Sequence, residues 1–309
     1  IIEFIKDKKS ILKLAQLHNI DGIISAGSDA AIPAIGEINS KLNLIGPKKE
    51  SCEKLANKIE MKKAFVKHNI THAKYFTFLN RKEFLTKVDN LKYPFVLKPS
   101  DLSGSKGVKI VSSLELALSY IENESPKYDK KFVCEEFIEG IEVGAQAIIH
   151  DGYTTQIIIH NDYVTKGQVP IPFGHSLPFQ MSKKIKKLIE EECVKAINSL
   201  SLSNCIVNFD LIINNDKVYI IELSPRIGGT CIPEILTYAG NQNIYEYLIN
   251  LILGKAREFK LDNKQYVSGF LIKSDKSGIL KKYSMNKNYD KSGIKEFIMD
   301  NGVGDKVRK

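Results

Sequence analysis

The run from Lys98 to Val108, Lys-Pro-Ser-Asp-Leu-Ser-Gly-Ser-Lys-Gly-Val, places a glycine-rich loop directly after a short apolar stretch. Tyr93 to Leu97 is typical of a buried strand that Pro99 ends, and Val108 to Val111 is typical of a second strand. A Walker phosphate loop has the order G-x-x-x-x-G-K-[ST] and leads into a helix, and this run does neither. The sequence therefore predicts a hairpin whose loop forms a lid.

The chemistry of this loop favours a polyphosphate ligand. Lys98 ends the first strand, where its ammonium would face a cleft. Gly104 and Gly107 let the backbone adopt a positive φ and approach a ligand closely. Further hydrogen-bond donors in the loop are Ser100, Ser103, Ser105 and Lys106. The alternative is a solvated serine-glycine hairpin whose lysines bind nothing.

A chain of 309 residues exceeds what one hydrophobic core usually serves, so two or three subdomains are expected. No apolar stretch approaches the roughly 20 residues that span a bilayer, and no signal-peptide pattern opens the chain. The cysteines are Cys52, Cys134, Cys193, Cys205 and Cys231, without a C-x-x-C pair. These features predict a cytoplasmic protein with buried, reduced thiols and no membrane partner.

The net charge of +9 comes almost wholly from lysine, because only four residues are arginine. Nucleic-acid sites favour arginine with interleaved aromatic residues on one face, and that pattern is absent. We therefore expect a basic solvated surface and a small phosphate-bearing ligand, with no nucleic-acid partner.

The start of the chain has the pattern of half a parallel α/β unit. Ile11, Leu14 and Ala15 form a helical stripe, Gly22 to Ser25 begins a strand, and Ile32 to Leu42 is helical again. The first strands of such a unit are missing from the sequence, so a trimmed chain is expected.

Further along, Ser51 is expected to cap a helix that runs to about Lys67. This helix carries Lys58 and Lys62 one turn apart on one face, where lysines are ordinarily solvated. Asp162 to Pro178 is predicted to be a long irregular loop of the kind that is often functional. An amphipathic helix from Ser182 to Leu200 and a last helix from Asn243 to Gly254 follow.

The strand and turn from Cys134 to Glu142 are suited to a nucleoside. Phe137 and Ile138 would expose backbone donors and acceptors, flanked by apolar surface, to the edge of a purine. Glu142, after the turn at Gly140, could accept hydrogen bonds from a vicinal diol. The alternative is that these glutamates are simply solvated at a strand end.

Asp210 and Glu222 each lie inside an otherwise apolar strand of a predicted hairpin, Ile206 to Leu223. A three-residue turn would place the two carboxylates opposite each other on one face. Buried charges need compensation, and a hard divalent cation such as magnesium would supply it. The alternative is neutralisation by a basic residue, for which Arg226 is near enough in sequence.

Several of these segments, taken in order, resemble motifs of the ATP-grasp superfamily. They are Asn57-Lys58, Pro94 to Pro99, Ser103 to Val108, Glu135 to Glu142, Asn208-Phe-Asp210 and Ile221 to Arg226. The resemblance covers about residues 8 to 255 and is greatest to carboxylate-amine ligases and carbamoyl-phosphate synthase-like proteins. His175-Ser-Leu-Pro178 is similar to the loop before the long helix in small-molecule carboxylate-amine ligases.

The resemblance implies an α/β chain with α+β subdomains in the ATP-grasp part. Residues 1–70 would be a partial N-terminal parallel α/β domain with a linker helix, and residues 71–139 the lid subdomain. Residues 140–255 would be the catalytic subdomain with the metal site, and residues 256–309 a partial β-rich region. Its partners would be a small-molecule carboxylate and an amine, and a homodimer is one assembly open to it.

The resemblance also assigns roles to residues. Lys58 and Lys98 would bind the α- and β-phosphates of ATP, and Ser103, Gly104, Ser105, Lys106, Gly107 and Val108 would form the mobile phosphate lid. Glu135 and the backbone of Glu136 and Ile138 would meet the adenine, and Glu142 the ribose, with Phe137 also among the nucleotide-binding residues. Asp210, Glu222 and Ser224 would hold magnesium or manganese, and Arg226 and Lys98 would act in catalysis.

The implied reaction is attack of a carboxylate on the γ-phosphate, followed by attack of an amine on the acyl phosphate, with release of ADP and phosphate. The family usually has Asn where this chain has Ser224, and a hydroxyl binds magnesium more weakly than an amide oxygen. Two other functions therefore stay open: a nucleotide-binding module without ligase activity, and bicarbonate activation through carboxyphosphate.

Overall fold

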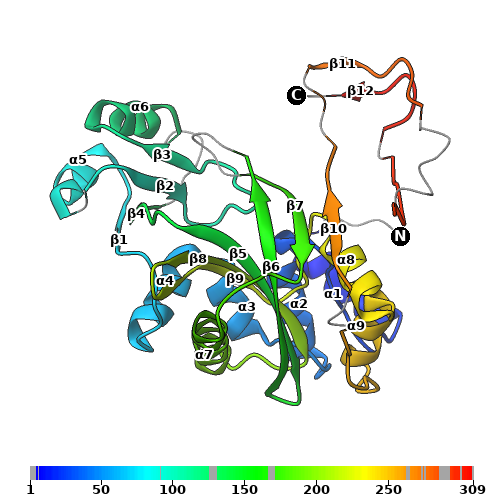
Figure 1. Cartoon of the computed structure of the whole chain (residues 1–309). Helices are drawn as coiled ribbons and strands as arrows, with labels where there is room; N and C mark the ends of the chain where they lie inside the picture. The colour runs from blue at the N-terminus through cyan, green and yellow to red at the C-terminus, as the bar shows by residue number, and fades with distance from the viewer. Residues whose placement is uncertain are drawn as a thin grey trace. The chain divides into compact units, whose positions relative to one another are not determined.

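The computed structural model describes residues 5, 7–90, 92–124, 131–165, 171–261, 265–272, 274, 276–284, 293–299 and 301–307. The chain divides into two compact units, Ile1–Phe270 and Leu271–Lys309. The first contains two antiparallel sheets with their helices (Figure 1). The second contains one antiparallel pair, β11 (Gly278–Ile279) and β12 (Lys306–Val307). Within the described ranges, no helix combines the length and apolarity needed to cross a membrane.

The N-terminal part of the first unit is helical. Its elements are α1 (Lys8–Leu17), η1 (Asp29–Ala31), α2 (Ile32–Lys41), α3 (Lys49–Leu55) and α4 (Lys58–Lys67). The helical segments expected around Ile11 and from Ile32 are confirmed. The strand expected from Gly22 is wrong, since only an isolated parallel bridge joins Ala26 to Ile227. This segment therefore contacts the loop after β9 through that bridge and is not an edge strand of a parallel sheet.

The single helix expected from Ser51 to Lys67 is instead two helices. Ser51 lies inside α3, where its hydroxyl donates to the carbonyl of Leu200. Asn57 breaks the run and caps α4, because its side chain accepts from the backbone N–H groups of Ile59 and Glu60. This break places Lys58 at the first position of α4, next to the glycine-rich loop.

The smaller sheet has the strand order β1-β4-β2-β3. Its strands are β1 (Tyr75–Phe78), β2 (Phe95–Pro99), β3 (Lys109–Val111) and β4 (Phe132–Glu136), and its helices are α5 (Arg81–Leu85), η2 (Val88–Asn90) and α6 (Leu114–Glu124). Phe78, Phe84, Phe95 and Phe132 fill the core between them. The predicted pairing of the strands on either side of the glycine-rich loop is confirmed, with Leu97 opposite Lys109.

The larger sheet has the strand order β10-β7-β6-β5-β8-β9. The strands are β5 (Ile141–His150), β6 (Tyr153–Val164), β7 (Pro172–Leu177), β8 (Cys205–Asn214), β9 (Lys217–Ser224) and β10 (Val267–Phe270), and the helices are α7 (Lys183–Ser199), α8 (Ile232–Gly240) and α9 (Ile244–Ile252). The expected helices from Ser182 and from Asn243 are confirmed, and each of these two residues caps its helix. The helix α8 was not predicted.

The prediction of an irregular loop from Asp162 to Pro178 is largely wrong. β6 continues to Val164, and β7 returns from Pro172 to Leu177 to pair with it. The remainder of the expected loop, residues 166–170, lies outside the described residues. The polar residues of this stretch are therefore fixed on strands instead of being carried by a loop.

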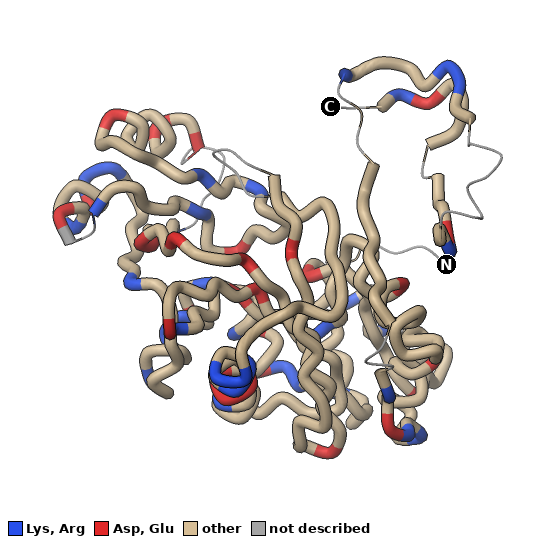
Figure 2. The backbone as a smooth tube through the Cα atoms, viewed as in Figure 1, with Lys and Arg blue, Asp and Glu red and all other residues tan. Residues whose placement is uncertain are grey.

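The two faces of the larger sheet differ in chemistry. One face packs Val143, Ala145 and Phe209 against α4 and α7 in the largest hydrophobic cluster. The outer side of α7 carries ion pairs spaced one turn apart, and its mixed blue and red positions are visible in Figure 2. The opposite face is apolar only at one end, where Ile148 and Ile206 pack under α8 and α9. The middle of that face carries the polar side chains of Gln146, His160, Asn208 and Asp210, because residues two apart on a strand share a face.

Candidate active site

The β8–β9 hairpin places Asp210 directly opposite Glu222, as predicted. The reason differs from the expected three-residue turn. Asn214 pairs with Lys217, so the turn has two residues, and by itself it would place Asp210 opposite Ile221. A register shift between Asp210 and Leu211 moves the partner by one residue and brings the two carboxylates onto the same face.

Asp210 lies on the polar face of the larger sheet. Its side chain is open to solvent, yet protein atoms crowd it on most sides. This desolvation, followed by the charges of Glu222 and Asp162, raises the pKa of Asp210 to about 7. The amide of Asn208 donates to its Oδ1 over 3.0 Å. A hard divalent cation fits this carboxylate pair, because it would supply the compensation that the protein gives only in part.

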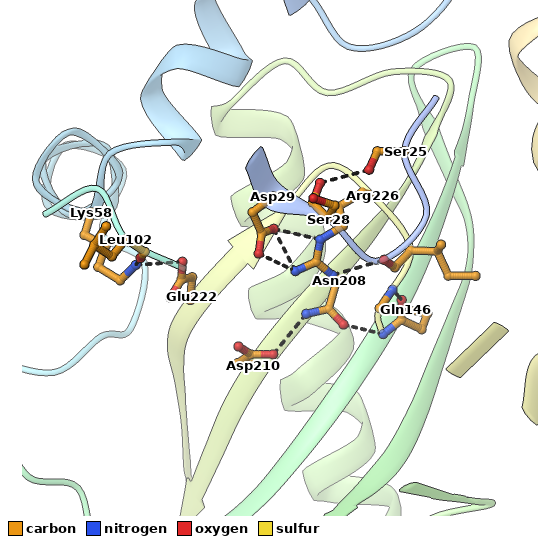
Figure 3. A network of polar contacts seen from close by, with 12 residues as sticks. Ser25, Ser28, Asp29, Lys58, Leu102, Gln146, Asn208, Asp210, Glu222 and Arg226 are labelled. Atoms are coloured by element: carbon orange, nitrogen blue, oxygen red, sulfur yellow. Dashed lines mark hydrogen bonds and ion pairs between the residues drawn. The ribbon is translucent and has the colours of Figure 1, made fainter. Parts of the chain in front are cut away.

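Glu222 is neutralised by Lys58, which reaches across from α4 (Figure 3). The Lys58 Nζ donates to Glu222 Oε1 over 3.0 Å and to the carbonyl of Leu102 over 2.5 Å. The backbone N–H of Lys58 donates to the carbonyl of Ser100 over 2.7 Å. Lys58 therefore connects the start of the glycine-rich loop to the carboxylate pair. The alternative partner from the sequence, Arg226, points elsewhere.

A buried charge triad lies behind the loop. The carboxylate of Glu135 on β4 lies between two lysines, 3.3 Å from the Nζ of Lys62 and 2.9 Å from the Nζ of Lys98. All three side chains are nearly inaccessible to solvent. Burial lowers the pKa of Lys62 to about 8, and the charge of Glu135 opposes that shift. The resemblance places Glu135 at the adenine, whereas in the structure its carboxylate contacts the two lysines.

The segment after β4 departs at Glu136 from the expectation of a free backbone donor. The N–H of Glu136 already donates to the carbonyl of Lys74, and the Glu136 carboxylate accepts from the N–H of Lys74. Phe137 is exposed, and Ile138 is half-buried in the irregular connection to β5. Glu142 is half-buried on β5, where burial and then the Asp162 charge raise its pKa.

The glycine-rich loop has the backbone that its sequence requires. Gly104, Ser105 and Gly107 have φ values of 66°, 57° and 70°. A Cβ on Gly107 would lie 2.8 Å from the Cγ of Pro99, whereas a Cβ on Gly104 would meet nothing within 4 Å. The hydroxyl of Tyr120 on α6 donates to the carbonyl of Gly107. The loop is thus anchored at Gly107 and open at Gly104.

Arg226 follows β9 and is held by a residue far away in sequence, Asp29 (Figure 3). Its Nε and Nη2 donate to the two oxygens of Asp29, each over 2.7 Å, and its Nη1 donates to the carbonyl of Ile227 over 3.0 Å. A guanidinium has five N–H groups, and among the described residues three of those of Arg226 have a partner, which leaves two for a ligand. Ser224 and Lys58 help Arg226 to keep the pKa of Asp29 low against the effect of burial.

Replacing Asp29 by asparagine should loosen Arg226 without removing it. A charge-assisted hydrogen bond contributes about 1.5–3 kcal/mol, so the variant should unfold at a lower temperature. Asp29→Glu, which retains the charge, should lose less. Thermal unfolding of the two variants checks this, and an equal loss in both would show that the shape of Asp29, not its charge, matters.

The sequence missed a row of polar residues that continues the site across the sheet. Gln146 on β5 donates to Asn208 Oδ1 over 2.6 Å and accepts from the N–H of Gly228 over 2.9 Å. Its Nε2 also lies 3.1 Å from a ring nitrogen of His160 on β6. Each is a polar residue inside an apolar strand, the same signal that identified Asp210.

The comparisons with known proteins agree with this geometry. Residues 55–230, more than half of the chain, match a family model described as an ATP-grasp domain. A phosphoribosylamine–glycine ligase of Fusobacterium nucleatum is 23% identical, over 94% of this chain and 76% of its own length. An alanine–anticapsin ligase of Bacillus subtilis is 24% identical, over 84% of this chain and 60% of its own length.

A solved structure shares the fold over the whole chain. It is the crystal structure of phosphoribosylglycinamide synthetase from Anaerococcus prevotii, with a TM-score of 0.76 and 28% identity. The match covers 100% of this chain and 78% of that one. The two relatives are ligases by name, and the chain belongs to the ATP-grasp family.

Proposed function

We propose that this chain activates a small-molecule carboxylate with ATP and transfers the acyl group to an amine, releasing ADP and phosphate. The observation that carries the proposal is that residues suited to bind phosphate lie next to carboxylates suited to bind a metal ion. Lys58 joins the glycine-rich loop to Glu222, and Glu222 faces Asp210. Such a site neutralises the charge of a phosphoryl group in transit, which is the main requirement of this reaction.

In this proposal Lys58 and Lys98 bind the phosphates of ATP, and residues Ser103 to Val108 close over them. Glu135 acts through its contacts with Lys62 and Lys98, which it holds in place. Exposed Phe137, the backbone of Ile138 and half-buried Glu142 are suited to the nucleoside. Glu136 contributes through its carbonyl, since its N–H is already engaged.

Asp210, Glu222 and Ser224 would hold magnesium, or manganese, whose positive charge would offset the charge of the phosphates. The hydroxyl of Ser224 stands where the family usually has an amide. In the register of the hairpin, Asn208 lies opposite Ser224 and already donates to Asp210. Asn208 therefore supplies an amide beside the carboxylates, although from the neighbouring strand.

The substrate carboxylate attacks the γ-phosphorus, and the bond to the β,γ-bridging oxygen breaks, so that ADP leaves. Lys98 stabilises the charge that develops on the phosphates, and the two unengaged N–H groups of Arg226 stabilise the acyl phosphate. The amine then attacks the acyl carbon, and phosphate departs. Closure of the loop would exclude water from the acyl phosphate.

Purified protein supplied with magnesium, ATP, a panel of amino acids and a panel of amines should release ADP and phosphate. The two relatives act on glycine and alanine by name, which makes amino acids the first substrates to test. Release of AMP and pyrophosphate would contradict the acyl-phosphate route. An arm with bicarbonate alone separates carboxyphosphate chemistry from ligase chemistry.

A nucleotide-binding module without ligase activity is the second candidate, and Ser224 is the observation that favours it. Ser224→Asn would then raise ADP release from none to a measurable rate. Ligase activity in the parent protein would exclude this candidate.

The four buried thiols, Cys52, Cys134, Cys193 and Cys205, and the use of ATP support a cytoplasmic location.

The loop gives a matched pair of variants. Gly104→Ala and Gly107→Ala both place a side chain at positive φ, which costs about 1 kcal/mol. Only Gly107→Ala also forces a Cβ against Pro99. We expect Gly107→Ala to raise the KM for ATP more than Gly104→Ala does, as measured by steady-state ADP release. A larger effect from Gly104→Ala would mean that the open tip, not the anchored end, contacts the nucleotide.

A further inference from the structure

Two histidines share one carboxylate on the polar face of the larger sheet. The Nδ1 atoms of His160 and His175 lie 2.8 Å and 2.6 Å from the same oxygen, Oδ1 of Asp162. His175 on β7 lies directly opposite Asp162 on β6, and the two imidazole rings meet edge to face. All three side chains are mostly shielded from solvent.

The hydrogen bonds determine which nitrogen of each ring carries a proton. The two histidines hold the pKa of Asp162 at about 2 despite its burial, so this carboxylate is ionised and only accepts. Each Nδ1 therefore donates to it. The Nε2 of His160 then accepts from the amide of Gln146, 3.1 Å away. The Nε2 of His175 has no hydrogen-bond partner in the part of the chain that the structure describes, and it is not fully enclosed.

This group lies on the same face as the carboxylate pair. Gly144 on β5 pairs with Asp210 on one side and with His160 on the other. A Cβ on Gly144 would lie only 2.0 Å from the His160 ring, so the ring occupies the space over this glycine. Neighbouring strands are about 4.8 Å apart, which places the histidines about 10–15 Å from Asp210. An acyl phosphate formed beside Asp210 could extend its acyl group toward them.

We propose that His175, oriented by Asp162, is the general base that accepts the proton of the attacking amine. This inference rests on the proposed ligase function and deepens it. The nitrogen lone pair of the neutral amine bonds to the acyl carbon, the carbon–oxygen bond to phosphate breaks, and the N–H proton passes to Nε2 of His175. The imidazolium that forms is stabilised by Asp162, the arrangement that activates nucleophiles in other enzymes.

His160 has a different role, because both of its ring nitrogens are engaged and only 1% of it is exposed. It positions Asp162, and a series of hydrogen bonds links it through Gln146 and Asn208 to Asp210. In the proposed reaction the proton that His175 accepts comes from a primary amine, such as the α-amino group of an amino acid.

Hydroxylamine gives a direct test, because it is neutral at pH 7 and strongly nucleophilic, and it traps acyl phosphates without a general base. His175→Gln should still form hydroxamate from ATP and the amino acid at the parent rate. The same variant should form the amide with an alkyl amine about 10²-fold more slowly, the contribution expected of a general base. Asp162→Asn should show the same split, and exposed His68→Gln, the matched control, should show none.

The outcomes separate the two proposals. Equal losses with hydroxylamine and with the amine would overturn the base and leave ligase activity in place. No hydroxamate from the parent protein with any acid would overturn the proposed function itself, and the base with it.

A second measurement needs no substrate. Nitrogen-15 spectra of histidine-labelled protein, assigned with His175→Gln, should show His175 protonated at Nδ1 and unprotonated at Nε2. The opposite tautomer would overturn the proposal. Stoichiometric zinc in the purified protein would also overturn it, because the same three side chains could form a metal site and the Nδ1 atom would then be a ligand.

Discussion

Glu135→Ala should lower the stability of the protein more than any other single change in the site. It leaves Lys62 and Lys98 buried with no carboxylate between them. Removing one partner of a buried ion pair typically costs about 3–5 kcal/mol, which corresponds to a fall in Tm of about 10 °C in a chain of this size. Differential scanning calorimetry at pH 7 measures this directly.

Lys62→Met is the matched control for that experiment. It keeps the pair between Lys98 and Glu135 and replaces a buried charge with an apolar side chain of similar length, so the change in stability should be small. The pH dependence gives a further check. Lys62 has a folded pKa of about 8, below its usual value, so the parent gains stability as the pH rises above 8, and Lys62→Met should lack this gain. A loss in Lys62→Met as large as that in Glu135→Ala would refute the central position of Glu135.

Asp210→Asn is expected to slow turnover strongly and to stabilise the metal-free protein. The loss of one metal-binding carboxylate should reduce ADP release by about 10³-fold, since a bound metal contributes several kcal/mol to the transition state. The folded pKa of Asp210, about 7, is above its usual value, so the ionised carboxylate destabilises the fold as the pH rises from about 4 to 7. The variant should therefore melt at a higher temperature than the parent at pH 8, and at the same temperature at pH 4.

Asp216→Asn provides the control within the same hairpin. Asp216 is exposed at the turn and pairs with Lys184 on the surface, so its replacement should change neither turnover nor melting temperature. Addition of magnesium to the ADP-saturated proteins at pH 8 should raise the Tm of the parent and of Asp216→Asn but not that of Asp210→Asn. If magnesium stabilised all three equally, the carboxylate pair would not be the metal site.

The sequence was sufficient where the signal was local and periodic. The polar residues Asp210 and Glu222 were recognised because they interrupt apolar strands, and the structure confirms that they face each other. The same reasoning applied to Gln146 and His160 would have found the rest of the polar face. The turn length was wrong because a register shift inside a strand leaves no trace in composition.

Tertiary contacts decided what the sequence could not. Lys62 has the sequence of a solvated helix lysine, and only the packing of α4 against the smaller sheet buries it beside Glu135. Asp29 is 197 positions from Arg226, and nothing in its neighbourhood indicates an arginine partner. The frequent prolines and glycines around Asp162 predict a loop, whereas pairing with neighbouring strands fixes this stretch as β-structure.

Through its two contacts, Lys58 couples the position of the loop to the charge of the carboxylate pair. Its ammonium now binds Leu102, at the base of the loop, and Glu222, in the carboxylate pair. If phosphate oxygens bound this ammonium, its contacts with Leu102 and Glu222 would be lost together. The loop would then be free to move, and Glu222 would become available to a cation only when the nucleotide has arrived. The order in which nucleotide and metal engage would thus be set by one side chain.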